Sequence, residues 1–349
     1  MNETQCVVLF SGGIDSLAAL LWARQTYSNV LAIYCDVGQR YAKKEIISVS
    51  KICKSLNQPY IIERRLKLGD MELTKERNAI IPYRNSFFIL LASAHLPPEG
   101  GVVVLQNLVQ GEDSTWDRRE KFNIQMQNLL NVADQKNVKI VVPFANFTKS
   151  QIVRELIQSK ECSSKIIIDT IGCYSKTKKN CGECNSCFRS YIALKHNDLD
   201  IIIKSRFAKD PAKWKGVKQY IAKMKAGLYG EERTQETLNV FPELAKKCKV
   251  YAIDIDGVLC PQHPFPPFDE DYEKYYSTLC PNKKAIDKVN SLFIDGHAIV
   301  LYTSRHEEDR KVTEEWLGKN NVHYHRLILG KFKADAYVDD KLMELWKLW

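Results

Sequence analysis

Short apolar runs alternate with stretches of helical periodicity over the first 170 residues of the chain. Residues 5–25 (QCVVLFSGGIDSLAALLWARQ) combine an apolar run, a Ser-Gly-Gly turn and apolar residues at helical spacing, which predicts strand, turn and helix. The alternation continues, with strands expected at 29–40, 59–66, 100–109 and 139–144 and helices at 41–56, 84–96, 121–134 and 149–160. This pattern predicts an α/β fold with a doubly wound parallel sheet, whose ligand lies at the carboxyl ends of the strands near the Ser-Gly-Gly turn.

The alternation stops near residue 170, and residues 205–240 are basic and helical in pattern. A second alternating stretch then begins with an apolar run at residue 249. It predicts strands at 249–259, 297–304 and 336–340 and helices at 283–295 and 306–320. We therefore expect two α/β domains, at residues 1–245 and 246–349.

The composition is that of a globular protein. Two domains are the usual expectation for 349 residues, and 45% hydrophobic with 27% charged residues excludes disorder and low complexity. Every apolar run is shorter than the roughly 18 to 20 residues that a membrane span needs. The N-terminal sequence MNETQCVVLFSGG lacks the basic region and apolar stretch of a secretory signal. We expect a cytoplasmic protein with no membrane partner.

The net charge of +9 is unevenly distributed. Residues 1–250 carry 38 Lys and Arg against 25 Asp and Glu, whereas residues 251–349 carry 13 against 17. A basic first part suits an anionic ligand such as ATP, or a nucleic acid. A solvated lysine-rich surface is the alternative interpretation, particularly for Lys176, Lys178 and Lys179.

The Ser-Gly-Gly turn has the features of a phosphate site. Two glycines let the backbone approach an anion closely, and the following helix would present free N–H groups at its positive end. No lysine follows as in a Walker A loop. The alternative is a tight turn in which Asp15 or Ser16 caps the helix. We interpret the turn as an ATP site made by Ser11, Gly12, Gly13, Asp15 and Ser16.

Four of the eleven cysteines crowd into fifteen residues. Their spacing, C-x7-C-x2-C-x2-C, supplies four thiolates that can close a tetrahedral Zn²⁺ site with no open position. An iron–sulfur cluster also takes four cysteines. We interpret the group as structural zinc ligands: Cys173, Cys181, Cys184 and Cys187.

SGGxDS resembles the pyrophosphate loop of the N-type ATP pyrophosphatases. Three further strings, together with the cysteine cluster, make residues 5–195 similar to the 7-cyano-7-deazaguanine synthase (QueC) family. They are Asp36-Val37-Gly38-Gln39-Arg40, Ile81-Pro82-Tyr83-Arg84-Asn85 and Glu112-Asp113-Ser114. The sequence departs from the family's pattern in two places. The family usually has glycine at the position of Tyr83, and residues 115–122 match the family's pattern only loosely.

The resemblance implies a PP-loop domain, of the adenine nucleotide alpha-hydrolase-like fold, with a four-cysteine zinc module. It implies that ATP and Mg²⁺ activate the carboxylate of 7-carboxy-7-deazaguanine as an acyl-adenylate, which an amine attacks. With ammonia the product is an amide, and a second adenylation gives the nitrile. Asp36 would join the ATP site, and the substrate would contact Gln39, Arg40, Arg84, Asn85, Glu112 and Asp113.

Carboxylates also end the strands of the second domain. Asp254 and Asp256 lie two residues apart after an apolar run and project to one side, which favours a shared cation. With Thr303 at the next strand end, Lys331, and the pair Asp339-Asp340, they resemble the motifs of the haloacid dehalogenase (HAD) phosphatases. The resemblance implies a smaller, Rossmannoid HAD-like domain.

The implied phosphatase chemistry assigns a role to each motif. Asp254 would attack phosphorus, and Asp256 would protonate the leaving oxygen and then activate water. Thr303 would bind the phosphoryl group, Lys331 (alternatively Lys333) would screen its charge, and Asp340 would assist. Mg²⁺ would be held by Asp254, Asp256 and Asp339 with the Ile255 carbonyl.

The favoured hypothesis is an ATP-dependent, QueC-like ligase or nitrile synthase fused to a Mg²⁺-dependent phosphatase. A first alternative is a ligase of bacterial anti-phage defence that joins the deazaguanine to a protein amine. A second is a tRNA- or DNA-modifying enzyme, whose binding would weaken steeply with salt. A third is a binding module with one inactive site. The sequence leaves open the phosphatase substrate, ammonia or a protein as acceptor, amide or nitrile as product, and a homodimer.

Overall fold

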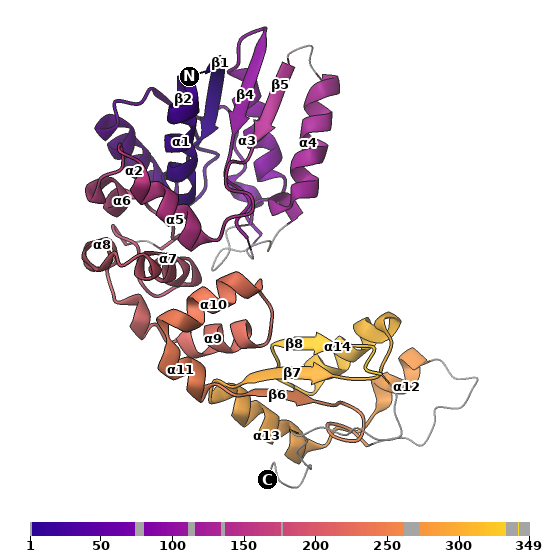
Figure 1. The fold of residues 1–349 in the computed structure, drawn as a ribbon. Helices are drawn as coiled ribbons and strands as arrows, with labels where there is room; N and C mark the ends of the chain where they lie inside the picture. Colours follow the sequence, from indigo (N-terminus) through magenta and orange to yellow (C-terminus); the bar gives the residue numbers. More distant parts are fainter. Residues whose placement is uncertain are drawn as a thin grey trace. The chain divides into compact units, whose positions relative to one another are not determined.

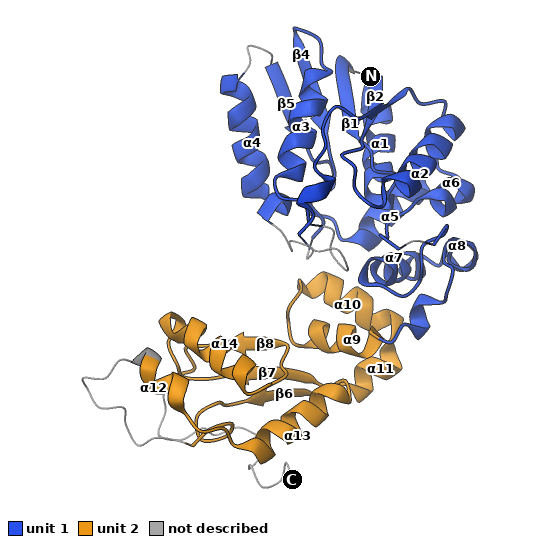
Figure 2. Cartoon of the chain, turned by 180° about the vertical axis from the view of Figure 1, so that it is seen from behind, with its two compact units in different colours: residues 1–215 blue, residues 216–349 orange. Residues whose placement is uncertain are grey.

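The structure is a computed structural model that describes residues 2–73, 80–110, 116–133, 137–175, 177–261, 272–332 and 341. The chain divides into two compact units, residues 1–215 and 216–349, shown in different colours in Figure 2. Each unit is described separately below. Within the described residues, no helix is both long and apolar enough to cross a membrane.

Unit 1 is built on a sheet of five parallel strands in the order β3-β2-β1-β4-β5. The strands are β1 (Asn2–Leu9), β2 (Tyr27–Cys35), β3 (Tyr60–Glu63), β4 (Gly100–Val104) and β5 (Asn137–Val141). In the register of the sheet, Val7 of β1 is paired with Leu31 of β2 on one side and Val103 of β4 on the other. The strand order reverses between β1 and β4, which is where sheets of this kind bind ligands.

The helices of unit 1 lie on both faces of this sheet and, for the last two, beyond the carboxyl ends of its strands (Figure 1). They are α1 (Ile14–Thr26), α2 (Ala42–Ser55), α3 (Arg84–Ala94), α4 (Glu120–Ala133), α5 (Lys149–Gln158), α6 (Ser164–Asp169), α7 (Asn185–His196) and α8 (Asp200–Arg206), with 3-10 turns at Gly69–Met71, Trp116–Arg118 and Pro211–Lys213. α3 and α4 bury Ile89 and Met126 against Val7, Ile33 and Val103. Successive residues of a strand face opposite sides, so the intervening residues face α1. The predicted doubly wound parallel sheet is confirmed.

Unit 2 contains a parallel sheet with the described strand order β6-β7-β8. Its elements are β6 (Val250–Ile253), β7 (Ala298–Tyr302), β8 (Arg326–Ile328), α9 (Val217–Lys225), α10 (Glu231–Val240), α11 (Pro242–Lys247), α12 (Tyr272–Thr278), α13 (Lys283–Ile294) and α14 (Arg310–Lys319), with a 3-10 turn at Glu307–Asp309. Ile253, Ile286, Leu301 and Trp316 belong to one buried core. The strand predicted at 336–340 lies outside the described residues, and the short β8 was not predicted.

The division between the units lies earlier than the predicted boundary near residue 245. α9 belongs with the second sheet because its Gln219 bonds to two elements of unit 2. The Gln219 Nε2 donates to the Phe293 carbonyl at 2.5 Å, and its Oε1 lies 2.8 Å from the His325 Nε2. Helical periodicity in residues 205–240 predicted the helices but carried no information about which sheet they cover.

Candidate functional site

The Ser-Gly-Gly turn joins β1 to α1 and depends on Gly12. Gly12 has a φ of +73°, and a Cβ there would lie 2.8 Å from the Ser48 Oγ. That hydroxyl has one hydrogen to donate, and it lies within hydrogen-bond distance of two carbonyl acceptors, 3.0 Å from the Gly12 oxygen and 2.8 Å from the Asp169 oxygen. Gly13 is the N-cap of α1 and no side chain caps the helix, so the capping alternative for Asp15 and Ser16 is not observed. The first turn of α1 therefore has backbone N–H groups of the kind that bind anions at helix N-termini.

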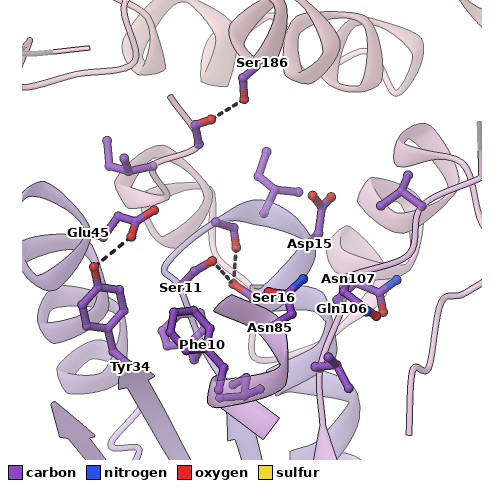
Figure 3. A pocket seen from close by; sticks show the side chains of 18 of the residues that line it. Phe10, Ser11, Asp15, Ser16, Tyr34, Glu45, Asn85, Gln106, Asn107 and Ser186 are labelled. Atoms are coloured by element: carbon purple, nitrogen blue, oxygen red, sulfur yellow. Dashed lines mark hydrogen bonds between the residues drawn. The ribbon is translucent and has the colours of Figure 1, made fainter. Parts of the chain in front are cut away.

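A cavity of about 240 Å³ opens at the carboxyl ends of β1, β2 and β4 (Figure 3). Predicted residues on its wall are Ser11, Gly13, Asp15, Ser16, Gln39, Arg84 and Asn85. The Ser11 and Ser16 hydroxyls lie 3.1 Å apart, and the Ser16 Oγ also donates to the Gly13 carbonyl at 3.1 Å. The structure thus brings seven of the twelve predicted ATP- and substrate-binding residues of unit 1 around one space.

Two of the predicted ATP- and substrate-binding residues lie outside this wall, and each pairs with the side chain of another residue. The Asp36 Oδ2 accepts from the Arg64 Nε at 3.2 Å, and the Arg40 Nε lies 3.0 Å from the Glu72 Oε1. Gly12 acts through the turn conformation and is not on the wall either. Glu112 and Asp113 lie outside the described residues.

Among the charged side chains of the cavity wall, cations outnumber anions. The cationic side chains are Arg84, Arg118, Lys149, Arg189 and Arg206, against the carboxyl groups of Asp15 and Glu45. Burial lowers the pKa of Arg206 to about 10, against the opposing effect of nearby anionic groups. At neutral pH this arginine still carries its charge, so the described wall has an excess of positive charge suited to a polyphosphate or a carboxylate.

Lys149 is a site residue that the sequence interpretation missed. Its Nζ lies 2.7 and 2.5 Å from the two carboxylate oxygens of Asp15. Lys149 begins α5, whose N-cap Thr148 forms a capping box with Gln151. The predicted strand before it placed Lys149 at the carboxyl edge of the sheet, and that position was the signal that could have identified it.

Gln39 and Arg84 organise the wall between β2 and α3. The buried Gln39 accepts from the Val37 N–H at 2.8 Å through Oε1 and donates to the Tyr34 hydroxyl at 2.6 Å through Nε2. Arg84 donates through NH1 to the Tyr41 hydroxyl at 2.9 Å. The buried Arg84 Nε has no hydrogen-bond partner among the described residues. Gln39 therefore supports the wall, and Arg84 retains a donor that an anionic ligand could use.

Tyr83, the departure from the family's glycine, occupies a left-handed backbone conformation. Its φ is +59°, and its side chain is 72% exposed just before α3. Glycine reaches this region at no steric cost, whereas a residue with a Cβ is strained there by about 1–2 kcal/mol. Tyr83 therefore adopts a backbone conformation that glycine reaches more easily.

The four predicted zinc ligands lie together. All four Sγ atoms are within 4.8 Å of one another, and those of Cys181 and Cys187 are 3.7 Å apart. Sulfur ligands of a tetrahedral Zn²⁺ at about 2.3 Å lie about 3.8 Å apart, so the donor set fits this ion. Hydrogen bonds from the thiols of Cys181, Cys184 and Cys187 hold the pKa of Cys173 well below its usual range. Among the described residues, no second cluster of such metal-binding groups occurs.

Carboxylates and cations also meet after β6 in unit 2. The Lys331 Nζ donates to the Asp254 Oδ2 at 2.7 Å. The buried Arg305 holds both oxygens of Asp256, with its NH2 at 2.7 Å from Oδ1 and its Nε at 3.0 Å from Oδ2. The Thr303 Oγ1 lies 3.4 Å from the Asp256 Oδ2. Four predicted residues therefore lie together, and Arg305, to which no role was assigned, completes the group.

One predicted metal ligand of unit 2 is engaged in the backbone. The Ile255 carbonyl accepts from the N–H groups of residues 258, 259 and 260 at 3.2, 2.8 and 3.2 Å. It is a turn acceptor and is not available to a metal, because these donors occupy its lone pairs. Lys333, Asp339 and Asp340 lie outside the described residues.

Comparison with known proteins finds a family model and several related sequences that match unit 1. The family model described as "Queuosine biosynthesis protein QueC" matches residues 5–198, which ends before unit 2. The 7-cyano-7-deazaguanine synthase of Sulfurimonas denitrificans is 26% identical over 207 residues, covering 54% of this chain and 91% of that protein. The synthase of Sulfurovum sp. is 28% identical, covering 52% and 90%, and that of Pseudoalteromonas translucida is 28% identical, covering 55% and 94%.

Proposed function

The chain belongs to the QueC family through its residues 5–198, and from this premise we propose that unit 1 is an ATP-dependent ligase acting on 7-carboxy-7-deazaguanine. ATP would activate the carboxylate as an acyl-adenylate with release of pyrophosphate, and an amine would then attack the acyl carbon. The observation that carries this proposal is the uncapped first turn of α1 opening into a cavity whose wall is rich in Lys and Arg. Such a wall stabilises the charge that develops during adenylation.

The proposal assigns a role to each part of the wall. The N–H groups at the start of α1 and the hydroxyls of Ser11 and Ser16 would bind the polyphosphate. Lys149 would screen the phosphate charge at the reacting centre. The unused Nε of Arg84 makes this residue the candidate to bind the substrate carboxylate. These groups position the reactants, and positioning with electrostatic stabilisation supplies most of the catalysis in such transfers.

We assign the four cysteines a structural role as zinc ligands. The cluster borders the cavity through its neighbours, because Gly172, Ser186 and Ser190 are on the wall. The Ser186 hydroxyl donates to the Gly172 carbonyl, so α7 and the preceding segment are tied together there. Bound zinc would contribute folding free energy and hold this part of the wall, and its four sulfur ligands leave no open position for catalysis.

The test of unit 1 is to incubate the protein with ATP, Mg²⁺, 7-carboxy-7-deazaguanine and ammonia, and to follow the products by mass spectrometry. Formation of an adenylate, amide or nitrile together with pyrophosphate is expected. A nitrile would identify a complete synthase. An adenylate that is consumed only after a protein with a free amine is added would indicate a protein acceptor. Absence of pyrophosphate release under all these conditions would refute the proposal.

For unit 2 we propose a Mg²⁺-dependent phosphatase of the HAD type. The supporting observation is the pairing of two neighbouring carboxylates with separate cations, Asp254 with Lys331 and Asp256 with Arg305. Asp254 would form a bond to phosphorus while the P–O bond of the substrate breaks, and Asp256 in its protonated form would give a proton to the leaving oxygen. Asp256 would then take a proton from the water that hydrolyses the aspartyl-phosphate, which releases phosphate and restores Asp254. Mg²⁺ would be held by Asp254 with Asp339 and would offset the phosphoryl charge.

A chromogenic aryl phosphate tests this site with Mg²⁺ present. Asp254→Asn should abolish phosphate release and leave the ATP turnover of unit 1 unchanged, because the residues of each site belong to different units. Loss of both activities in this variant would contradict two independent sites. Failure of the wild-type protein to release phosphate from aryl phosphates, sugar phosphates and nucleotides would refute the phosphatase.

A further inference from the structure

One carboxyl group on the wall of the unit 1 cavity has no role in the mechanism above. Glu45 lies in the first turn of α2 and lines the cavity, where Figure 3 shows it beside Tyr34. The Tyr34 hydroxyl and the Glu45 Oε2 are 2.9 Å apart. Because Gln39 donates to that hydroxyl at 2.6 Å, the hydroxyl hydrogen is directed at Glu45. The Glu45 carboxyl is therefore oriented by a chain of neutral donors.

The other carboxyl on the described wall has a different environment. Both oxygens of Asp15 contact the Lys149 Nζ, so a cation already occupies that carboxylate. Glu45 receives hydrogen bonds from neutral groups, the Tyr34 hydroxyl and the Gln39 amide, and remains able to accept a proton. The charged or titratable groups that act on Glu45 or its partner Tyr34 come from β2, the following loop, α2 and α3: Tyr34, Asp36, Tyr41, Lys44 and Arg84.

Burial raises the pKa of Glu45 to about 7, and the Tyr34 hydrogen bond and then the charge of Arg84 oppose this rise. A general base is most effective when its pKa lies near the working pH. A carboxyl group with its ordinary pKa would be too weak a base to remove a proton from an amine nitrogen efficiently. The environment of Glu45 therefore suits proton transfer at neutral pH.

We propose that Glu45 is the general base that accepts the proton of the attacking amine. This inference rests on the proposed function of unit 1. The amine nitrogen forms a bond to the acyl carbon of the adenylate, and the bond from that carbon to the phosphate oxygen breaks. AMP leaves with the electron pair, and the nitrogen gives one proton to the Glu45 carboxylate. The products are an amide, AMP and the protonated Glu45, which returns its proton to solvent.

The experiment separates the two half-reactions. Adenylation is followed by exchange of labelled pyrophosphate into ATP, and the second step by single-turnover amide formation from the enzyme-bound adenylate. Glu45→Gln keeps the size of the side chain and an acceptor for Tyr34. We expect exchange close to that of the wild type, and amide formation lowered by about 10²- to 10⁴-fold. Glu161→Gln, which removes a carboxylate that pairs with Arg24 away from the cavity wall, is the matched control and should change neither step.

The pH dependence provides a readout that a purely structural role would not change. In the wild type, the rate of amide formation should rise with pH through the pKa of Glu45. Glu45→Gln should lose this rising limb of the pH–rate profile. Tyr34→Phe removes a hydrogen bond that lowers this pKa, so the limb should move to higher pH.

Each outcome decides the proposal. Normal exchange with an unchanged amide rate and pH profile in Glu45→Gln would overturn the role of Glu45 alone. Loss of exchange in Glu45→Gln, with a thermal melt like that of the wild type, would assign Glu45 to adenylation and also overturn it. Absence of exchange in the wild type would overturn the proposed function and the role of Glu45 together.

Discussion

Replacing Lys149 by methionine tests whether the cation that meets Asp15 acts on ATP. The Lys149 side chain is 14% exposed and that of Asp15 is 26% exposed, so the pair is largely shielded from solvent. Two unit charges about 4 Å apart attract by about 4 kcal/mol at an effective dielectric constant of 20. In the Lys149→Met variant, a phosphate oxygen that gains negative charge during the reaction would lack an attraction of this size. Removal of one such donor typically lowers kcat by about 10²- to 10³-fold, which is the decrease we expect in pyrophosphate release.

The assay measures pyrophosphate release over a range of ATP concentrations, together with thermal unfolding. Lys51→Met is the matched control, because Lys51 is an exposed lysine on α2 that pairs with Asp169 and is not on the cavity wall. This control should retain its activity. Wild-type turnover in Lys149→Met, or an equal loss in Lys51→Met, would refute the reasoning. If Lys149→Met unfolds at the same temperature as the wild type but releases less pyrophosphate, the loss is due to the missing cation and not to unfolding.

Three further predictions concern the zinc cluster, the second unit and pH. Cys184→Ser should release zinc, measured by metal analysis of the purified protein, and lower its melting temperature; a variant with full zinc content and stability would contradict the structural role. Arg305→Lys should lower phosphate release by about 10- to 100-fold without changing ATP turnover, because lysine cannot contact both oxygens of Asp256 as the guanidinium does. Full phosphatase activity in this variant would contradict the positioning role of Arg305. The pKa of Glu45 is about 7 in the folded protein and near its ordinary value in the unfolded chain, so this group costs stability as pH rises through this range. Urea unfolding should therefore show Glu45→Gln gaining stability relative to the wild type between pH 4.5 and pH 7.5, by at most about 3 kcal/mol, and a constant difference would contradict the shift.

Local patterns in the sequence were sufficient to predict most of the elements, the Ser-Gly-Gly turn and the cysteine cluster. The turn at Ser11–Ser16 joins consecutive elements, and the four cysteines lie within fifteen residues, so both depend on contacts between near neighbours in the chain. Hydrophobic periodicity predicted the alternating strands and helices of residues 5–160 for the same reason. Such features can be predicted because the residues that determine a turn, a helix or a cysteine cluster are close together in the sequence.

The tertiary structure decided which side chains meet. Lys149 reaches Asp15 across 134 positions and Arg305 reaches Asp256 across 49, and no local pattern links the two members of either pair. Asp36 and Arg40 belong to a motif that suggested ligand contacts, yet each pairs with a side chain from another segment. The near-neutral pKa of Glu45 likewise requires burial, which depends on how helices pack over the sheet. The sequence by itself therefore determined most of the helices and strands and the chemical groups that they carry. Packing decided which charged side chains line the cavity and which are paired with an opposite charge elsewhere.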